Sequence, residues 1–321
     1  MNELTVHTLA DDDAAAVERV LRRLCEVPDG RLDSAEFLAV ARQTCEELPS
    51  GFRGVLRRFR RDCGPGGALL LRGMPIAESS LPRTPMDRGS VQRSATVPAA
   101  GLLLAALALG DPIAFTEEKS GALIHDVVPV PGMDESQSNA GSVQLTFHTE
   151  NAFHPYCPDF VLLLCLRPDP VGAAGLRVAG LGAALPLLDE QTRQALFRPE
   201  FVTASPPSFS VSRDTGEPEP VLRGDPGDPD MRLDLSATSA LTDTAGQALK
   251  ELGQAFAEVA VTVLLERGDL AIVDNRRAVH GRTEFHPRYD GEDRWLQRVF
   301  VHADIRRSRS LRCGDGHVLA S

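Results

Sequence analysis

The stretch Val143-Gln-Leu-Thr-Phe-His148-Thr-Glu150 decides which fold the rest of the chain can support. Apolar and polar side chains alternate over residues 143–147, which is typical of a β-strand, and the run ends in a His-X-Glu pair. Because side chains at positions i and i+2 of a strand share a face, His148 and Glu150 can reach one metal ion while Thr149 points away. An isolated pair of this kind is more often a histidine at a strand rim beside a surface glutamate, so a metal site needs a third ligand.

A segment far downstream supplies that candidate. Residues 269–274 read Asp-Leu-Ala-Ile-Val-Asp, which predicts a buried strand, and a polar turn then leads to His280. Two histidines and one carboxylate form the facial triad that leaves three coordination positions of Fe(II) open for cosubstrate, oxygen and solvent. The pattern predicts an oxygenase in which His148, Glu150 and His280 are the metal ligands.

Two arginines follow the distant histidine. Arg294 and Arg298 precede the strand-like run 299–302. A guanidinium presents a planar fork of donors that fits a carboxylate, so such an arginine can anchor the distal carboxylate of 2-oxoglutarate. For each arginine taken alone, a solvated ion pair with a nearby acid is the preferred interpretation. The His-X-Glu pair, the strand that leads to His280, and the two arginines are much less expected by chance in this order.

Three segments resemble the clavaminate-synthase-like Fe(II)/2-oxoglutarate oxygenases. They are FHTENAFHPY (147–156), DNRRAVHGR (274–282) and RYDGEDRWL (288–296). The similarity runs from about Leu69 to the C-terminus and is greatest to the branch that hydroxylates free arginine and asparagine. That branch carries Glu as the near carboxylate, as at Glu150. The resemblance implies iron, 2-oxoglutarate and O2 as the cofactor and cosubstrates.

The resemblance also implies roles for individual positions. Arg294 matches the arginine that binds the distal carboxylate of 2-oxoglutarate, and Arg298 matches the one that receives the substrate α-carboxylate. Glu118 corresponds to the residue that holds the α-amino group. Ser138 falls where a contact lines the pocket, and Asp234 falls where the family contacts the substrate side chain.

The stretch around Asp234 departs from the arginine-hydroxylase pattern. That enzyme has two carboxylates there, whereas this chain has Asp234 and, two residues earlier, Arg232. We expect the substrate to be a free L-α-amino acid that is hydroxylated at Cβ in natural-product biosynthesis. Its side chain is expected to be polar, and a basic side chain is favoured over an acidic one. An amide or acidic side chain fits better if Arg232 faces the pocket, and the two residues could also neutralise each other.

Other outcomes stay open on the same scaffold. They are action on a carrier-tethered or dipeptide amino acid, desaturation, cyclisation, and a non-catalytic jelly-roll binding protein. Among the other histidines, we expect His154 to support the site or lie at the surface. His7, His125, His286, His302 and His317 show no partner pattern and are left out of the site.

Composition agrees with an ordinary soluble enzyme and does not identify a substrate. Lys and Arg number 34 against 45 Asp and Glu, a net charge of −11, which argues against nucleic acid or an anionic membrane as the partner. The N-terminus lacks the basic and apolar regions of a signal peptide, and no apolar run is long enough to span a bilayer, so we expect a cytoplasmic protein. The cysteines form no CxxC pair that would indicate zinc.

We expect a mainly β fold with flanking helices, built on a double-stranded β-helix (jelly roll, cupin-like) core. The expected organisation is one domain over residues 1–321, with an N-terminal helical part at 1–66 and a lid insertion at 206–235. Helices are expected near residues 11–21, 34–41, 55–61, 98–109 and after Thr242. The predicted core residues are Leu145, Phe147, Val161, Leu163, Cys165, Leu270, Ile272, Val299 and Val301.

Overall fold

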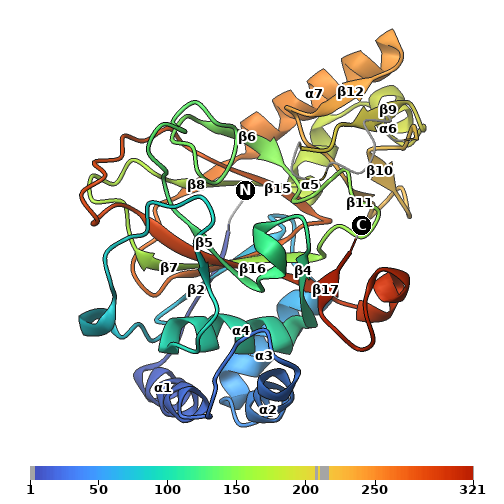
Figure 1. The fold of residues 1–321 in the computed structure, drawn as a ribbon. Helices are drawn as coiled ribbons and strands as arrows, with labels where there is room; N and C mark the ends of the chain where they lie inside the picture. Colours follow the sequence, from blue (N-terminus) through green and yellow to red (C-terminus); the bar gives the residue numbers. More distant parts are fainter. Residues whose placement is uncertain (1–3, 207–208, 210–216, 321) are drawn as a thin grey trace.

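The computed structural model describes residues 4–206, 209 and 217–320. Figure 1 shows strands stacked in two layers, with a group of helices below the larger layer and a long helix above the smaller one. The layers face each other, and the strands that carry the metal-binding motif lie in the smaller one.

The larger sheet has β7 (Phe160–Arg167), β14 (Leu270–Asp274) and β16 (Trp295–His302) at its centre. Nearly every residue of these strands is buried, because helices cover one face and the second sheet covers the other. Within the described residues the strand order is β1-β2-β14-β7-β16-β4-β17, with β5 pairing β16 and β3. The remaining strands are β1 (Thr5–Thr8), β2 (Ala68–Arg72), β3 (Val91–Gln92), β4 (Asp111–Phe115), β5 (Ile124–Val127) and β17 (Val318–Leu319).

The smaller sheet is antiparallel in the order β13-β8-β15-β6. Its strands are β13 (Val261–Val263), β8 (Leu176–Gly180), β15 (Ala278–Arg282) and β6 (Leu145–His148). The chain passes from β14 in the larger sheet directly to β15 in the smaller one, so His280 lies opposite its distant partner His148. The mainly β jelly-roll core with flanking helices is confirmed.

The first helices pack under the larger sheet. Helix α4 (Val97–Leu109) is apolar on all sides and lies between the sheet and the outer helices, which is the position where a helix without a polar face is stable. The Thr96 hydroxyl caps it by accepting a hydrogen bond from the Ala99 N–H. The outer helices are α1 (Asp11–Cys25), α2 (Ala35–Cys45) and α3 (Ser50–Arg61).

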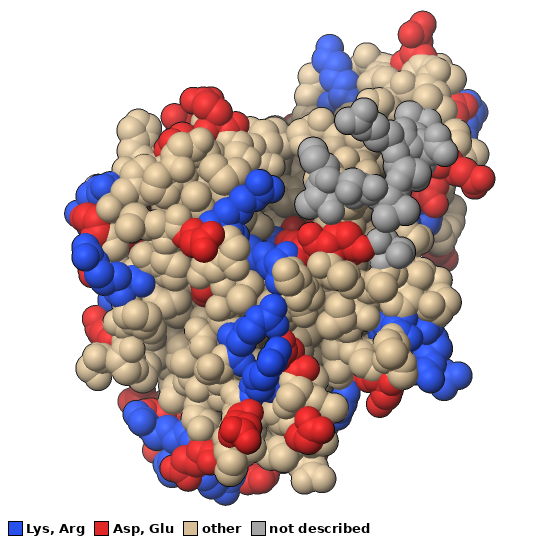
Figure 2. Space-filling model, in the orientation of Figure 1, with Lys and Arg blue, Asp and Glu red and all other residues tan. Residues whose placement is uncertain are grey.

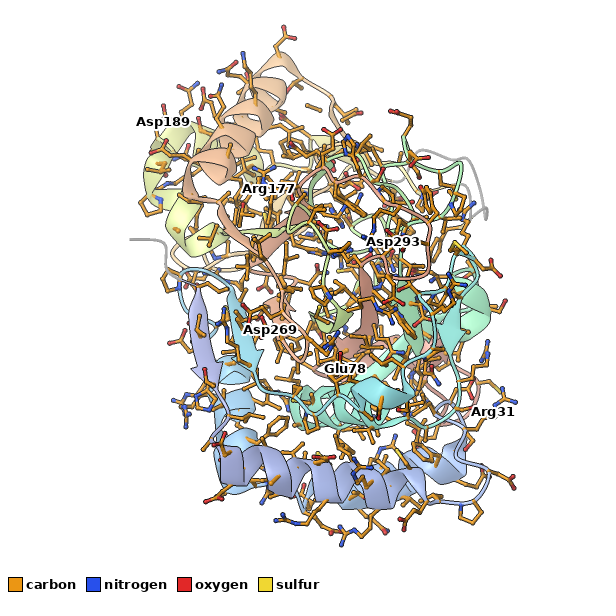
Figure 3. The ribbon with its side chains drawn as sticks, turned by 90° about the vertical axis from the view of Figure 1, so that its left-hand side faces the viewer. Arg31, Glu78, Arg177, Asp189, Asp269 and Asp293 are labelled. Carbon is orange, nitrogen blue, oxygen red and sulfur yellow. The ribbon has the colours of Figure 1, made fainter. Side chains whose placement is uncertain are left out.

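A second helical group covers the outer face of the smaller sheet. Helix α7 (Asp243–Val259) begins at a Thr242 cap and buries its apolar stripe with Leu181 and Val279 in one cluster. The neighbouring elements are α5 (Leu181–Ala184), α6 (Glu190–Leu196), β9 (Phe201–Thr203), β10 (Leu222–Arg223), β11 (Asp230–Met231) and β12 (Thr238–Ala240). Figure 3 shows Asp189, which caps α6, beside α7.

The expected lid, 206–235, is described only in part. Residues 207, 208 and 210–216 lie outside the described residues, while β10 and β11 pair with each other. The lid and the single-domain organisation therefore stay predictions. No helix in the described ranges has both the length and the apolar character needed to cross a membrane.

The predicted core is correct except at Leu145. That residue is only partly buried because β6 is the edge strand of the smaller sheet. The other predicted core residues are buried in the three apolar clusters of the molecule.

Candidate active site

His148, Glu150 and His280 converge on one point between the sheets. His148 ends β6 and pairs with His280 of β15 across the ladder, with ring centroids 4.5 Å apart. One ligand atom from each of the three residues lies within 4.8 Å of the others. Strand β6 stops at His148, so Glu150 reaches the site from the following turn rather than from a strand. Nitrogen and carboxylate donors in this number fit Fe(II) with open positions.

Asn275 holds the turn that carries Glu150. Its Oδ1 accepts a hydrogen bond from the Glu150 N–H at 2.7 Å, and its Nδ2 donates to the Glu150 carbonyl at 3.1 Å and to the Pro158 carbonyl at 3.0 Å. Asn275 is 1% exposed, and Asn151 bends the chain with a positive φ of 52°. Asn275 thus fixes both the N–H and the carbonyl of Glu150, and this fixed backbone positions the Glu150 carboxylate.

The hydrogen bonds of the His148 and His280 rings determine which ring nitrogens are available to a metal ion. His148 Nδ1 lies 2.9 Å from the Thr146 carbonyl, which can only accept, so this nitrogen carries the proton and leaves Nε2 free for a metal. His280 Nε2 lies 3.4 Å from Glu150 Oε2, and its buried Nδ1 has no partner within the described residues. Burial and the neighbouring His148 lower the pKa of His280, so the ring is neutral, as a ligand must be.

Gly281 separates His280 from Arg282 for a steric reason. A Cβ at this position would lie 2.5 Å from the Leu145 carbonyl oxygen, where β15 and β6 shift register. Only glycine permits this close approach, which keeps both neighbouring side chains on the interior face.

Arg298 joins the metal-binding carboxylate to a second acid. It lies within β16, is 1% exposed, and donates from Nη1 to Glu150 Oε1 at 2.8 Å and from Nη2 to Glu118 Oε1. Burial raises the pKa of each carboxylate, but the Arg298 charge and the neighbouring histidines together hold both below their usual range. The cluster holds two buried acids around one guanidinium, so each acid has a cationic partner while the three groups together carry a net charge of −1.

His125, which the sequence analysis left out of the site for lack of a partner pattern, belongs to this cluster. Its Nε2 donates to the Ala122 carbonyl at 2.8 Å, which leaves Nδ1 to accept from Arg298 Nη2 at 3.0 Å. The residue comes from β5, which pairs with β16 so that His125 lies directly opposite Arg298. No local sequence signal marks it, because the contact depends on the pairing of two strands far apart in the chain.

Two other arginines are buried without a carboxylate at ion-pair distance among the described residues. The Arg294 side chain is 5% exposed and makes no side-chain hydrogen bond or ion pair there, although the charge of the more distant Asp169 favours its protonated form. Arg282, which the sequence did not single out as a site residue, is 3% exposed, and burial together with the Arg294 charge lowers its pKa to about 9. The signal that could have found it is its spacing of two residues from His280 on the same strand face.

The remaining predicted contacts lie around this core. Asp234 pairs with His148 in an isolated β-bridge, so its side chain leaves the same face as the ring, and its Oδ1 accepts hydrogen bonds from Ser236 and Ala237. Arg232 donates to the Pro155 carbonyl at 2.7 Å and forms no hydrogen bond or ion pair with Asp234. Ser138 bonds to Ser136 Oγ at 2.8 Å, and within the described residues it has no hydrogen bond to the metal-binding residues or to Arg298.

A cavity of about 200 Å³ adjoins the chain that follows Glu150. Arg232 lines it together with Phe153, Glu219 and Arg223. His154 is buried and contacts the Phe115 ring edge-on at 4.8 Å. In Figure 2, acidic and basic side chains meet around a hollow in the upper centre of the visible face.

Comparisons with known proteins agree with this geometry. The model of the family described as "Taurine catabolism dioxygenase TauD, TfdA family" matches residues 67–300. L-asparagine oxygenase of Streptomyces coelicolor is 56% identical over 98% of this chain and 94% of its own. Clavaminate synthase 2 of Streptomyces clavuligerus is 37% identical over 88% of this chain and 87% of its own.

Two solved structures are also similar to this chain. Asparagine oxygenase in complex with Fe(II), (2S,3S)-3-hydroxyasparagine and succinate is 55% identical, with a TM-score of 0.96 over 98% of this chain and 99% of that one. The non-heme iron oxygenase OrfP in complex with Fe and alpha-ketoglutaric acid is 32% identical, with a TM-score of 0.90 over 99% of this chain and all of the other (100%). The expected resemblance is confirmed. The chain belongs to the TauD/TfdA family and is an Fe(II)/2-oxoglutarate-dependent dioxygenase.

Proposed function

We propose that this chain hydroxylates Cβ of free L-asparagine, with iron held by His148, Glu150 and His280. When bound, Fe(II) would activate O2 with two electrons from 2-oxoglutarate, which is converted to succinate and CO2; one oxygen atom enters the amino acid and the other enters succinate. The protein's own residues position both organic molecules and exclude water.

The observation that carries the proposal is the double contact of Arg298 with Glu118 and Glu150. A zwitterion offers a carboxylate to Arg298 and an ammonium group to Glu118, so it can replace the internal ion pair without leaving a buried charge unpaired. Arg298 also contacts the proposed iron ligand at 2.8 Å. The backbone of the amino acid is therefore held beside the metal, which places Cβ among the nearest carbons.

The side chain of Asp234 favours an amide over a cation. Its Oδ1 already accepts hydrogen bonds from Ser236 and Ala237, so the carboxylate does not depend on a cationic partner. An asparagine amide can donate to the remaining oxygen, whereas the carboxylate of aspartate would be repelled. The relative at 56% identity is named for asparagine, which supports the same substrate and replaces the basic side chain expected from the sequence.

The proposal includes a small-molecule partner and a cytoplasmic location. All six cysteines are free thiols, including the exposed Cys313, which suits a reducing compartment. Fractionation of producing cells would test the location.

Turnover of single amino acids tests the function. The protein is incubated with Fe(II), 2-oxoglutarate, O2 and, in separate reactions, asparagine, glutamine, aspartate, arginine or lysine. We expect succinate and a hydroxylated product with asparagine above all others. Turnover of arginine or lysine in place of asparagine would contradict the substrate while leaving the dioxygenase class intact.

A further inference from the structure

Arg282 and Arg294 form a buried pair of positive charges at the opposite end of the site from Glu118. They are 3% and 5% exposed, and neither lies within ion-pair distance of a carboxylate in the part of the chain that the structure describes. Arg294 is the charged group that acts on Arg282, and the acid that acts on Arg294, Asp169, lies beyond ion-pair distance. Such an arrangement is costly unless an anion completes it.

The bonds of Arg282 fix its direction without neutralising it. Nη2 donates to the Val143 carbonyl at 2.9 Å, and the guanidinium carbon lies 5.1 Å from the centre of the Phe285 ring. The Nε atom is buried and has no partner among the described residues. A neutral carbonyl and an aromatic ring hold the guanidinium in place, and part of its donor fork remains unused.

The position of Arg282 relates it to the metal. His280 and Arg282 leave the same face of β15, about 7 Å apart along the strand. Leu176 of β8 pairs with Arg282 and is a buried apolar residue, so this strand neighbour offers the guanidinium no polar partner. A dicarboxylate that chelates the metal with one end would direct its other end toward the two arginines.

We propose that Arg282 is a second binding residue for the distal carboxylate of 2-oxoglutarate, shared with Arg294, and that it sets the preference for a dicarboxylic 2-oxo acid. The two carboxylate oxygens offer enough lone pairs to accept from both guanidinium groups. The inference rests on 2-oxoglutarate being the cosubstrate and is independent of which amino acid is oxidised.

Binding without turnover tests the proposal. Arg282→Gln removes the charge and keeps a donor for Val143, and Arg294→Gln is the reference. Arg177→Gln is the matched control, because Arg177 (labelled in Figure 3) lies on neighbouring β8 opposite Gly281, and its guanidinium stacks on the Phe147 ring. Titrations are anaerobic with Fe(II) and no amino acid, using 2-oxoglutarate and 2-oxovalerate, which has the same chain length without the distal carboxylate.

We expect Arg282→Gln to weaken 2-oxoglutarate by about ten- to hundredfold and 2-oxovalerate by much less. The control should bind both as the unaltered protein does. The ligand-free melting temperature should be unchanged or higher in Arg282→Gln, because an unpaired buried charge has been removed, while the stabilisation by added 2-oxoglutarate should shrink.

An equal loss for both oxo acids, or no loss for either, would overturn the proposal and leave Arg282 a structural residue. If Arg282→Gln melts early, Arg282→Lys decides the matter because it keeps the charge but loses the fork. The proposal is supported if the selectivity of Arg282→Lys for 2-oxoglutarate over 2-oxovalerate lies between that of the unaltered protein and that of Arg294→Gln. Unchanged selectivity overturns it. No amino acid is present, so a failure here is separate from an error in the asparagine assignment.

Discussion

Arg298 and Arg294 lie four residues apart in the sequence, and both are almost fully buried. The charges around the two side chains are opposite in sign. Arg298 is enclosed by Glu118, Glu150 and His125. Arg294 has another arginine, Arg282, as its neighbour and no carboxylate within ion-pair distance among the described residues. At one end of the site every buried charge has a partner of opposite sign in the ligand-free protein, and the other end carries excess positive charge.

The difference agrees with the ligand proposed for each end. A zwitterionic amino acid adds no net charge, so its end of the site can pair its own charges before binding and pair them with the ligand afterwards. The distal carboxylate of 2-oxoglutarate adds a negative charge, which the Arg282 and Arg294 end lacks. The stability of the ligand-free protein and the affinity for the cosubstrate should therefore depend on different arginines.

The largest effect should come from removing the metal that both ends share. His148→Ala or His280→Ala leaves two protein ligands, which cannot hold the geometry of the triad, so iron binding and turnover should be abolished. Metal analysis and succinate release measure this, with His286→Ala, an exposed histidine of the loop before Arg294, as the control. Full iron content in either triad variant would refute the ligand assignment.

Arg298→Gln should destabilise the ligand-free protein by about 3–5 kcal/mol, since it leaves two buried carboxylates without their cation. Arg294→Gln should cost nothing in the same measurement. Urea unfolding of both metal-free variants compares them directly. Equal losses of unfolding free energy would show that the two ends do not differ in how their buried charges are paired.

Arg294→Gln should instead weaken 2-oxoglutarate by about a hundredfold, because a charge-assisted contact to the distal carboxylate is lost. The affinity for the amino acid, measured at saturating cosubstrate, should change little. Calorimetry with the Fe(II) protein gives both constants. A larger loss for the amino acid would place Arg294 at the wrong end of the site.

Asn275→Ala should lower Fe(II) affinity by about tenfold while the fold persists, since the Glu150 backbone loses both of its side-chain partners. Competition with a chelator measures the affinity, and circular dichroism checks the fold. An unchanged affinity would mean that the turn holds Glu150 without the amide.

The smallest effects should separate Asp234 from Arg232. Asp234→Ala should lower kcat/KM for asparagine by about tenfold through the loss of one hydrogen bond to the amide. Arg232→Ala should change it by less than about threefold, because its partners are the Pro155 carbonyl and the partly exposed Glu219. The reverse order would place Arg232 in the pocket and favour an acidic substrate.

The sequence predicted the parts of the site that local spacing encodes. His148, Glu150, His280, Arg294 and Arg298 each lie in or beside a short motif whose residue types suit metal or carboxylate binding. The jelly roll followed from the alternating and apolar strands that deliver them, and the apolar helix at 98–109 was expected for the same reason. These features depend on neighbours in the chain.

The missed features depend on strand pairing. His125 reaches Arg298 only because β5 pairs with β16, and Asn275 reaches Glu150 only because the β14–β15 turn packs on the turn after β6. The same holds for the lack of a carboxylate at ion-pair distance from Arg282 and Arg294 among the described residues, which no pattern along the sequence can show. Asp234 and Arg232 share a strand-like stretch, but each finds partners outside it, so the neutralisation considered from the sequence does not occur.

Isotopic labelling of one turnover tests the central claim most directly. The protein is supplied with Fe(II), 2-oxoglutarate, 18O2 and L-asparagine deuterated at both Cβ positions, and the products are analysed by mass spectrometry and NMR. The account predicts 3-hydroxyasparagine that has lost one deuterium and gained one 18O, with one labelled succinate for each product molecule. Hydroxylation at another carbon, retention of both deuterium atoms, or succinate formed without any change in asparagine would contradict it.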